Sequence, residues 1–332
     1  MKQIFSLNYS AGSSQMQASS VIGLVVICLL GFSHTFWYRH FQPDDAFIYL
    51  VYVKNLLIGN GLTFNGALVE GYSSILWTVL VSAISWLGLE PLTAAKVLGW
   101  CSYLLLGLLL VWTHRSVSQR PYAPLLSIVM YFSVPSIAMW AAGAMETVLF
   151  SMTIAAAAFS YFHARFVTPS KRLFVISGVL FGMVSLTRPE GFALVGSVIV
   201  FETILFLHYR RWVLKGAITT VSTWAVITAA MFVVRWIIYD RWFPTTVSAK
   251  TGNLSWQIHL GSNYISDFVS QHYVLIAVYL ASIVYAAISI RKSRPDQYFL
   301  IWLLTPFNTS SRLKEPSSCL SENAGASLSS RT

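Results

Sequence analysis

The sequence predicts an all-α protein that crosses a membrane many times, and three observations lead to this fold class. Hydrophobic residues make up 56% of the 332 residues and charged residues only 10%, whereas soluble domains carry roughly 25% charged residues. The mean hydropathy is +0.63. The chain also repeats apolar runs close to the ~20 residues that a helix needs to span a bilayer. These features exclude a soluble globular domain.

The net charge of +10 does not indicate a nucleic-acid partner. The basic residues gather in short segments between apolar runs, and this distribution is typical of the signals that orient membrane proteins. We therefore expect a lipid bilayer, and no nucleic acid, among the partners of the chain.

Each long apolar run predicts a transmembrane helix. The runs are residues 19–37, 92–112, 122–141, 148–166, 173–186, 192–207, 217–238 and 273–290, with a last one opening at Tyr298. Two further segments, 44–58 and 75–87, are apolar but too short to span. An acidic pair, Asp44 and Asp45, can N-cap the first of them, and the Gly59-Asn60-Gly61 stretch is expected to end it.

Charge determines the predicted topology. Basic residues fall at 114–120, 165–172, 208–215 and 291–294, and the positive-inside rule places such segments in the cytoplasm. Consecutive basic segments are separated by an even number of candidate spans, so the assignment is self-consistent. Segments 75–87 and 92–112 cannot then both span, and the shorter one is expected to lie along the interface. The outer loop 38–91 would thus carry two juxtamembrane helices.

This topology places most of the chemically interesting polar residues on the non-cytoplasmic side. They lie in the short segments 43–45, 143–147, 187–191 and 239–244. The expected organisation is a cytoplasmic segment at 1–18, a transmembrane domain at 19–307, and a polar, Ser-rich tail at 308–332. We interpret that tail as disordered, or as the product of a truncated or shifted reading frame.

Carboxylates are the first candidates for chemistry. Asp44 and Asp45 can act as a general base and its partner, or simply as an N-cap and a first-turn acid. Glu146 follows a run of small residues at the end of a span. An acid near membrane depth is costly and tends to have a partner or a function, although a first-turn helix acid explains it equally well.

Cations on the same side form the second group. Arg188 is a candidate for binding a lipid phosphate, because a guanidinium matches the geometry of a phosphate; alternatively it pairs with Glu190. Arg241 and Lys250 follow the run 217–238 and can serve the same anion. No nucleotide-binding loop is found, so an activated substrate is expected to arrive through the membrane.

The chain resembles the GT-C superfamily of polyprenyl-phosphate-sugar-dependent glycosyltransferases, and within it the arabinofuranosyltransferase-like branch that adds terminal arabinose to cell-wall polysaccharide. The resemblance covers about residues 19–307. The segments that carry it are PDDAFIY at 43–49, NLLIGNGLTFN at 55–65, VEGYSSILW at 69–77, GAMET at 143–147, LTRPEG at 186–191 and residues 239–250.

The resemblance implies an inverting transfer of a sugar to a glycan or lipid-linked acceptor outside the cytoplasm, at the cell inner membrane. It implies that Asp44 is the general base and that Asp45 helps to hold the base or positions the acceptor. Glu146 and Glu70 would position the acceptor, while Arg188, Arg241 and Lys250 would bind the donor phosphate. It leaves open whether a divalent metal is needed. Family members continue through more spans, so the chain looks C-terminally truncated.

Two alternatives remain at the level of sequence. The first is a transporter or flippase of lipid-linked sugars, whose polar residues would lie at mid-membrane depth. The second is an inactive, truncated glycosyltransferase.

Overall fold

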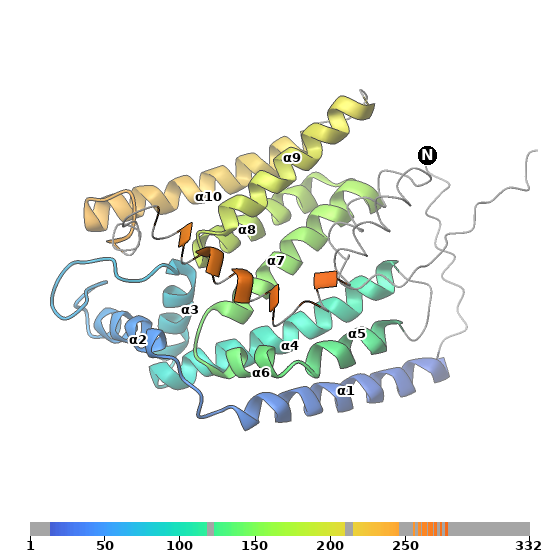
Figure 1. The fold of residues 1–332 in the computed structure, drawn as a ribbon, viewed down its shortest axis with the longest axis horizontal. Coiled ribbons are helices and arrows are strands. Elements are labelled where there is room, and N and C mark those ends of the chain that lie inside the picture. Colours follow the sequence, from blue (N-terminus) through green and yellow to red (C-terminus); the bar gives the residue numbers. More distant parts are fainter. Residues whose placement is uncertain are drawn as a thin grey trace, which may run out of the picture.

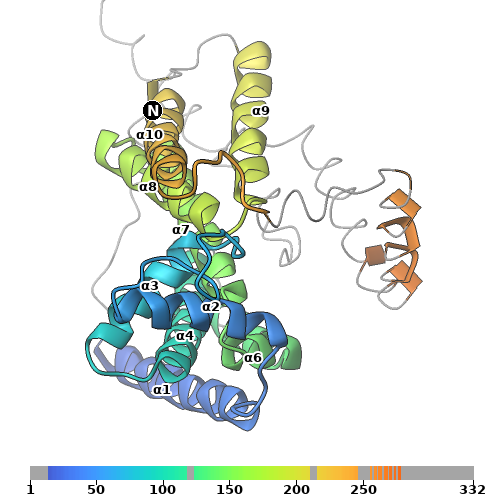
Figure 2. The ribbon, with the colours of Figure 1, turned by 90° about the vertical axis from the view of Figure 1, so that its left-hand side faces the viewer.

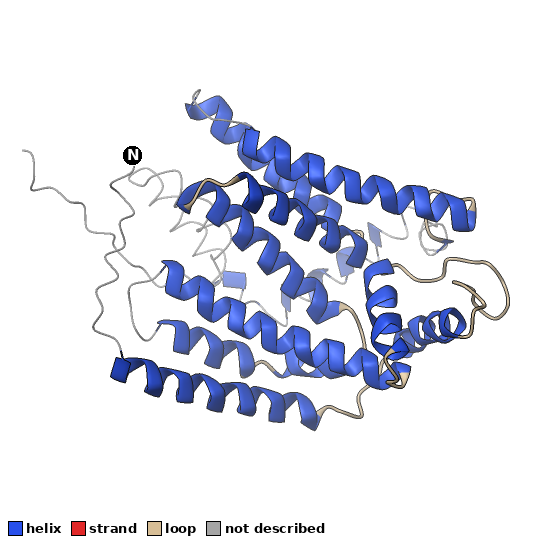
Figure 3. Cartoon of the chain, turned by 180° about the vertical axis from the view of Figure 1, so that it is seen from behind, coloured by secondary structure: helices blue, strands red, loops and turns tan. Residues whose placement is uncertain are grey.

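The computed structural model describes residues 14–117, 123–209 and 215–245, together with scattered residues between 255 and 277. Within those residues every regular element is a helix (Figure 3), which confirms the all-α class. The segment 1–13, the candidate span 273–290 for the most part, the span opening at Tyr298 and the tail 308–332 lie outside the described residues.

Most of the helices run alongside one another in a bundle (Figure 1). They are α1 (Ser14–Trp37), α2 (Asp44–Leu57), α3 (Ile75–Trp86), α4 (Pro91–Val117), α5 (Ala123–Phe132), α6 (Pro135–Ala142), α7 (Thr147–Phe162), the short π-helix η1 (His163–Val167), α8 (Lys171–Thr187), α9 (Gly191–Tyr209) and α10 (Lys215–Tyr239).

Three helices in the described part are long and apolar enough to cross a membrane. They are Pro91–Thr113, Thr147–Arg165 and Lys215–Tyr239, which matches the predicted spans 92–112, 148–166 and 217–238. The chain is therefore an all-α membrane protein. The predicted spans 19–37, 173–186 and 192–207 also form helices, α1, α8 and α9, but the full topology stays a prediction.

The two short helices α2 and α3 lie together at one end of the bundle, which we call the α2/α3 end. Figure 2 views the bundle from that end and shows both helices in front of the longer ones. The predicted helices 44–58 and 75–87 are confirmed. Gly59, with φ +83°, follows the end of α2 as expected. The N-cap of α2 is Pro43, however, and it makes no side-chain cap bond, so Asp44 and Asp45 are first-turn residues rather than caps.

The predicted span 122–141 is wrong as a single helix, because the chain breaks between α5 and α6. Proline cannot donate a backbone hydrogen bond, and it disfavours helical geometry in the residue before it. Val134 accordingly has an extended backbone, with φ −82° and ψ 108°, and Pro135 starts a new helix.

A buried ion pair stands at the opposite end of the bundle. The Arg165 guanidinium donates to both carboxylate oxygens of Glu202, from Nε at 2.8 Å and from Nη2 at 3.1 Å. Tyr161 donates its hydroxyl hydrogen to the same carboxylate at 2.6 Å. The pair ties α9 to the end of α7 and to η1. Sequence reasoning did not single out Glu202.

Helices α8 and α10 approach each other closely at Gly178. A Cβ atom built on Gly178 would lie 2.6 Å from the carbonyl oxygen of Thr220. Thr220 in turn donates its hydroxyl hydrogen to the Phe174 carbonyl at 3.0 Å. Small residues permit such close packing between membrane helices, so the glycine is required by the contact.

We expect Gly178→Ala to destabilise the protein by about 1–3 kcal/mol, the usual cost of overpacking, and to lower its melting temperature in detergent. Gly196→Ala is the matched control, since a Cβ there meets nothing within 4 Å, and alanine favours helix by about 1 kcal/mol over glycine. Equal melting temperatures for the two variants would contradict the prediction.

Candidate functional site

An arginine at the α2/α3 end lies between two carboxylates. Arg188 follows α8, and its Nη1 atom is 3.9 Å from Glu146 Oε1 while its Nη2 atom is 3.2 Å from Glu190 Oε1. The side chain of Glu146 is only 4% exposed, whereas that of Glu190 is 60% exposed. The structure thus joins two of the predicted site residues, Glu146 and Arg188. Arg188 also makes the predicted pair with Glu190.

Tyr49 of α2 completes this cluster from the other side. It is buried, and its hydroxyl lies 3.3 Å from Ser73 Oγ. Burial and then the negative charge of Glu146 raise the pKa of Tyr49 to about 12. Burial likewise raises the pKa of the Glu146 carboxyl, against the opposing effects of the Arg188 charge and the nearby Tyr49 hydroxyl. The cluster therefore combines a half-exposed cation with a deeply buried acid.

One oxygen of Glu146 is unused. Its Oε2 atom is buried and has no hydrogen-bond partner among the described residues. A buried polar atom without a partner costs about 1–3 kcal/mol, and such atoms in native structures need an explanation. A donor on a bound ligand would supply the missing hydrogen bond.

The turn that carries Glu146 packs against the link between α1 and α2. Ala144 has a left-handed backbone, with φ 55°, a conformation that costs energy for a residue with a side chain. The ring of Phe41 packs so closely on this turn that a Cβ on Gly143 would lie 3.1 Å from it. Phe41 also packs edge-on against Trp140. Since Asp44 follows Phe41 closely in sequence, the start of α2 lies beside the Glu146 turn.

Asp44 and Asp45 are exposed in the first turn of α2. Asp45 precedes Tyr49 by four residues, so the two side chains share one face of the helix. Within the described part of the chain, no ion pair involves either aspartate. Their roles as base and partner stay predictions.

Glu70 occupies a different environment from the one predicted. Its carboxylate accepts the Arg235 Nε–H, which is shared between the two oxygens at 3.0 and 2.8 Å, and both side chains are buried. Burial raises the pKa of Glu70, while the Arg235 charge opposes the rise. Both carboxylate oxygens are thus occupied, so direct contact between Glu70 and an acceptor stays a prediction that this geometry does not favour.

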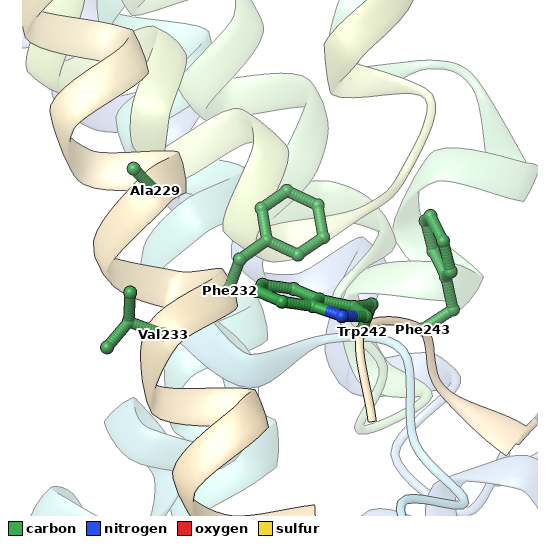
Figure 4. A pocket seen from close by; sticks show the side chains of 5 residues that line it. All are labelled: Ala229, Phe232, Val233, Trp242 and Phe243. Carbon is green, nitrogen blue, oxygen red and sulfur yellow. The ribbon is translucent and has the colours of Figure 1, made fainter. Parts of the chain in front are cut away.

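Arg241 lies in the segment after α10 and is exposed, next to Asp240, whose φ is 51°. Lys250 lies outside the described residues. Between α10 and the segment that follows it, the surface is hollowed over about 420 Å³, lined by Ala229, Phe232, Val233, Trp242 and Phe243 (Figure 4). The hollow is therefore apolar and mainly aromatic, and one of its lining residues, Trp242, follows Arg241 directly in the sequence.

Sequence reasoning missed three residues of this region. Arg235 had a signal, because a charge inside the apolar run 217–238 is costly in a membrane and implies a partner. Tyr49 and Ser73 lie inside two of the segments that carry the resemblance, 43–49 and 69–77, but an aromatic and a serine have no chemical signal of their own until packing brings them to Glu146. Where the structure describes the chain, no group of three His, Cys, Asp or Glu side chains could hold a metal ion.

Fold and site together define an all-α membrane protein with a buried carboxylate and an arginine at one end of its helical bundle. The chain is 29% identical over 259 residues to a terminal beta-(1->2)-arabinofuranosyltransferase of Mycobacterium tuberculosis (strain ATCC 25618 / H37Rv). The match covers 70% of this chain but only 38% of that relative. No family model and no solved structure matches. The similarity supports a distant glycosyltransferase relationship.

Proposed function

We propose that the protein is a membrane glycosyltransferase of the GT-C type. It moves a sugar from a polyprenyl-phosphate donor to an envelope glycan or lipid-linked acceptor on the non-cytoplasmic face of the cell inner membrane, with inversion. The observation that carries the proposal is the cluster of Glu146, Arg188 and Tyr49 beside the start of α2, together with the similarity to an arabinofuranosyltransferase.

On this proposal Asp44 removes the proton from the attacking acceptor hydroxyl, and Asp45 assists it. Their exposure leaves them open to an incoming acceptor. The unpartnered Oε2 of Glu146 accepts a hydrogen bond from another hydroxyl of the acceptor. A sugar offers several hydroxyl donors, so a buried carboxylate oxygen without a partner suits it well.

The donor phosphate is bound on the same proposal by Arg188, aided by Arg241 and Lys250. Negative charge grows on the phosphate as the glycosidic bond breaks, and a fixed cation stabilises that charge. Arg188 is suitable because it is half-exposed and its ion pair with Glu190 is at the surface, where such pairs are weak. The aromatic hollow lined by Trp242 and Phe243, which follow Arg241 in the sequence, offers apolar surface for isoprene units of the donor.

Sugar transfer in membranes that contain the full chain tests the proposal. The membranes receive a radiolabelled polyprenyl-phosphate pentose or hexose, and Asp44→Asn, Asp45→Asn and Asp240→Asn are compared at equal protein levels. Asp240 is also an exposed acid at this end, and asparagine tolerates its left-handed backbone, so Asp240→Asn is the matched control.

We expect transfer by the wild type and the control but none by Asp44→Asn, since the amide cannot accept the proton. Loss in Asp45→Asn with activity kept in Asp44→Asn would move the base to Asp45. Absence of transfer in the wild type, from both donors, would overturn the proposal.

A further inference from the structure

Arg235 and Glu70 form a buried ion pair between segments that are 165 residues apart. The exposed fractions of their side chains are 5% and 2%. A buried ion pair gains little stability overall, because desolvation of both charges offsets their attraction. The main effect of the pair is therefore the geometry that it imposes on the two segments.

Further hydrogen bonds join the same two segments. Thr245 donates from its hydroxyl and its backbone N–H to the Glu70 carbonyl, at 2.6 and 3.2 Å. The Tyr239 hydroxyl donates to the Leu62 carbonyl at 2.9 Å. Within its own segment, Arg235 Nη1 donates to the Trp242 carbonyl at 3.4 Å, which ties α10 to the residues after it. The end of α10 and residues 240–245, which include Arg241, are thus fastened to the loop between α2 and α3.

The loop leads from Glu70 directly to the Glu146 cluster. Gly71 donates its backbone N–H to the Tyr52 hydroxyl at 2.7 Å, which ties the loop to α2. Ser73, three residues after Glu70, contacts the Tyr49 hydroxyl, and Tyr49 faces Glu146. A short series of contacts therefore runs from Arg235 to Glu146.

We propose that Arg235 and Glu70 are a positioning pair, which holds the Arg241 segment in register with the Glu146 cluster. The inference rests on the proposed function, in which the Arg241 segment binds the donor phosphate and the Glu146 cluster holds the acceptor. Reacting atoms must be held close to their productive separation, and a displacement of about 1 Å can cost 100-fold in rate. Neither residue of the pair needs to touch a substrate.

The bundle contains its own control for this inference. Arg165 and Glu202 form another buried arginine–glutamate pair, with the same shortest distance of 2.8 Å, at the opposite end. Arg165 donates from two nitrogens, whereas Arg235 donates to its carboxylate from Nε alone. A lysine retains the charge of an arginine but lacks its planar fork, so it cannot hold a carboxylate in the same way. Arg235→Lys and Arg165→Lys are therefore matched substitutions that differ in location.

The test compares kcat/KM for transfer and amide hydrogen exchange of the purified full chain. We expect Arg235→Lys to lower kcat/KM by about 10- to 100-fold and to speed exchange in residues 143–147, although Arg235 does not contact that turn. Arg165→Lys is expected to leave kcat/KM and the exchange at 143–147 unchanged, even if it lowers the melting temperature as much as Arg235→Lys does.

Equal effects of the two variants on kcat/KM, or unaltered exchange at 143–147 in Arg235→Lys, would overturn the positioning role while leaving the proposed function intact. An inactive wild type would remove the proposed function instead. In that case the exchange measurement still decides whether the pair orders the Glu146 turn.

Discussion

Arg188→Gln is expected to slow sugar transfer by about 100- to 1,000-fold, the usual effect of removing one group that stabilises developing negative charge. The substitution removes the half-exposed cation that we assign to the donor phosphate, and the neutral amide cannot replace its charge. Initial rates at saturating acceptor, with the polyprenyl-phosphate donor varied, measure the effect.

Glu190→Gln is the control, and it should have the opposite effect on donor binding. Glu190 Oε1 lies 3.2 Å from Arg188 Nη2, so on the proposed function it competes with the donor phosphate for the guanidinium. An exposed ion pair is worth about 0.2–1 kcal/mol, so its loss should lower the KM for the donor by at most about fivefold. If Arg188→Gln transfers sugar at the wild-type rate, the phosphate is bound elsewhere.

Glu146→Gln is expected to reduce transfer by roughly 10- to 150-fold, the equivalent of a hydrogen bond to a charged group. The amide is nearly isosteric with the carboxyl, but its nitrogen cannot accept the hydrogen bond that we assign to the acceptor. The KM for the acceptor should rise, and the KM for the donor should change less.

The same variant is expected to have the opposite effect on stability. Burial raises the pKa of Glu146 above its ordinary 4.5, so the folded protein binds the proton more tightly than the unfolded chain does. The stability that Glu146 contributes is therefore complete below about pH 4.5 and is lost as the pH rises through the folded pKa. The groups that act on this pKa are Tyr49 from α2, Arg188 after α8, and Glu190.

Melting temperatures of wild type and Glu146→Gln between pH 4 and 8 test this linkage. The difference between them should shift in favour of the variant as the pH rises, because glutamine has no proton to lose. A difference that is constant with pH would show that Glu146 ionises equally in both states. Reduced transfer together with reduced stability at neutral pH would indicate a purely structural role.

The fold was predictable from the sequence because apolar length and basic loops are strong signals in membrane proteins. Of the two short helices between α1 and α4, the first was predicted from its acidic start and the glycines that end it, and the second was placed at the interface by counting crossings. The break between α5 and α6 was missed, although Pro135 inside an apolar run was the available signal for it. The acids of α2 were found, but the extended geometry of Pro43, which makes it the N-cap, was not foreseen.

The candidate site was only partly predictable. The predicted topology put Glu146 and Arg188 on the same side of the membrane, and the structure brings them to 3.9 Å. Topology gives no information about which residues on one side touch. It could not reveal that Tyr49 faces Glu146, or that Arg235 occupies the carboxylate of Glu70. Such contacts depend on the packing of α2 and α10, which is set by many side chains together.

The separation of Glu70 from Arg235 has a consequence for biosynthesis. Ribosomes add about 5–20 residues per second, so Glu70 waits roughly 8 to 33 s for the codon of Arg235 to be read. During that interval the nascent loop between α2 and α3 carries an acid without its partner, and water or a chaperone must accommodate it. The loop between α2 and α3 can form its ion pair only after α10 has been inserted. A segment that is synthesised early therefore reaches its final structure late.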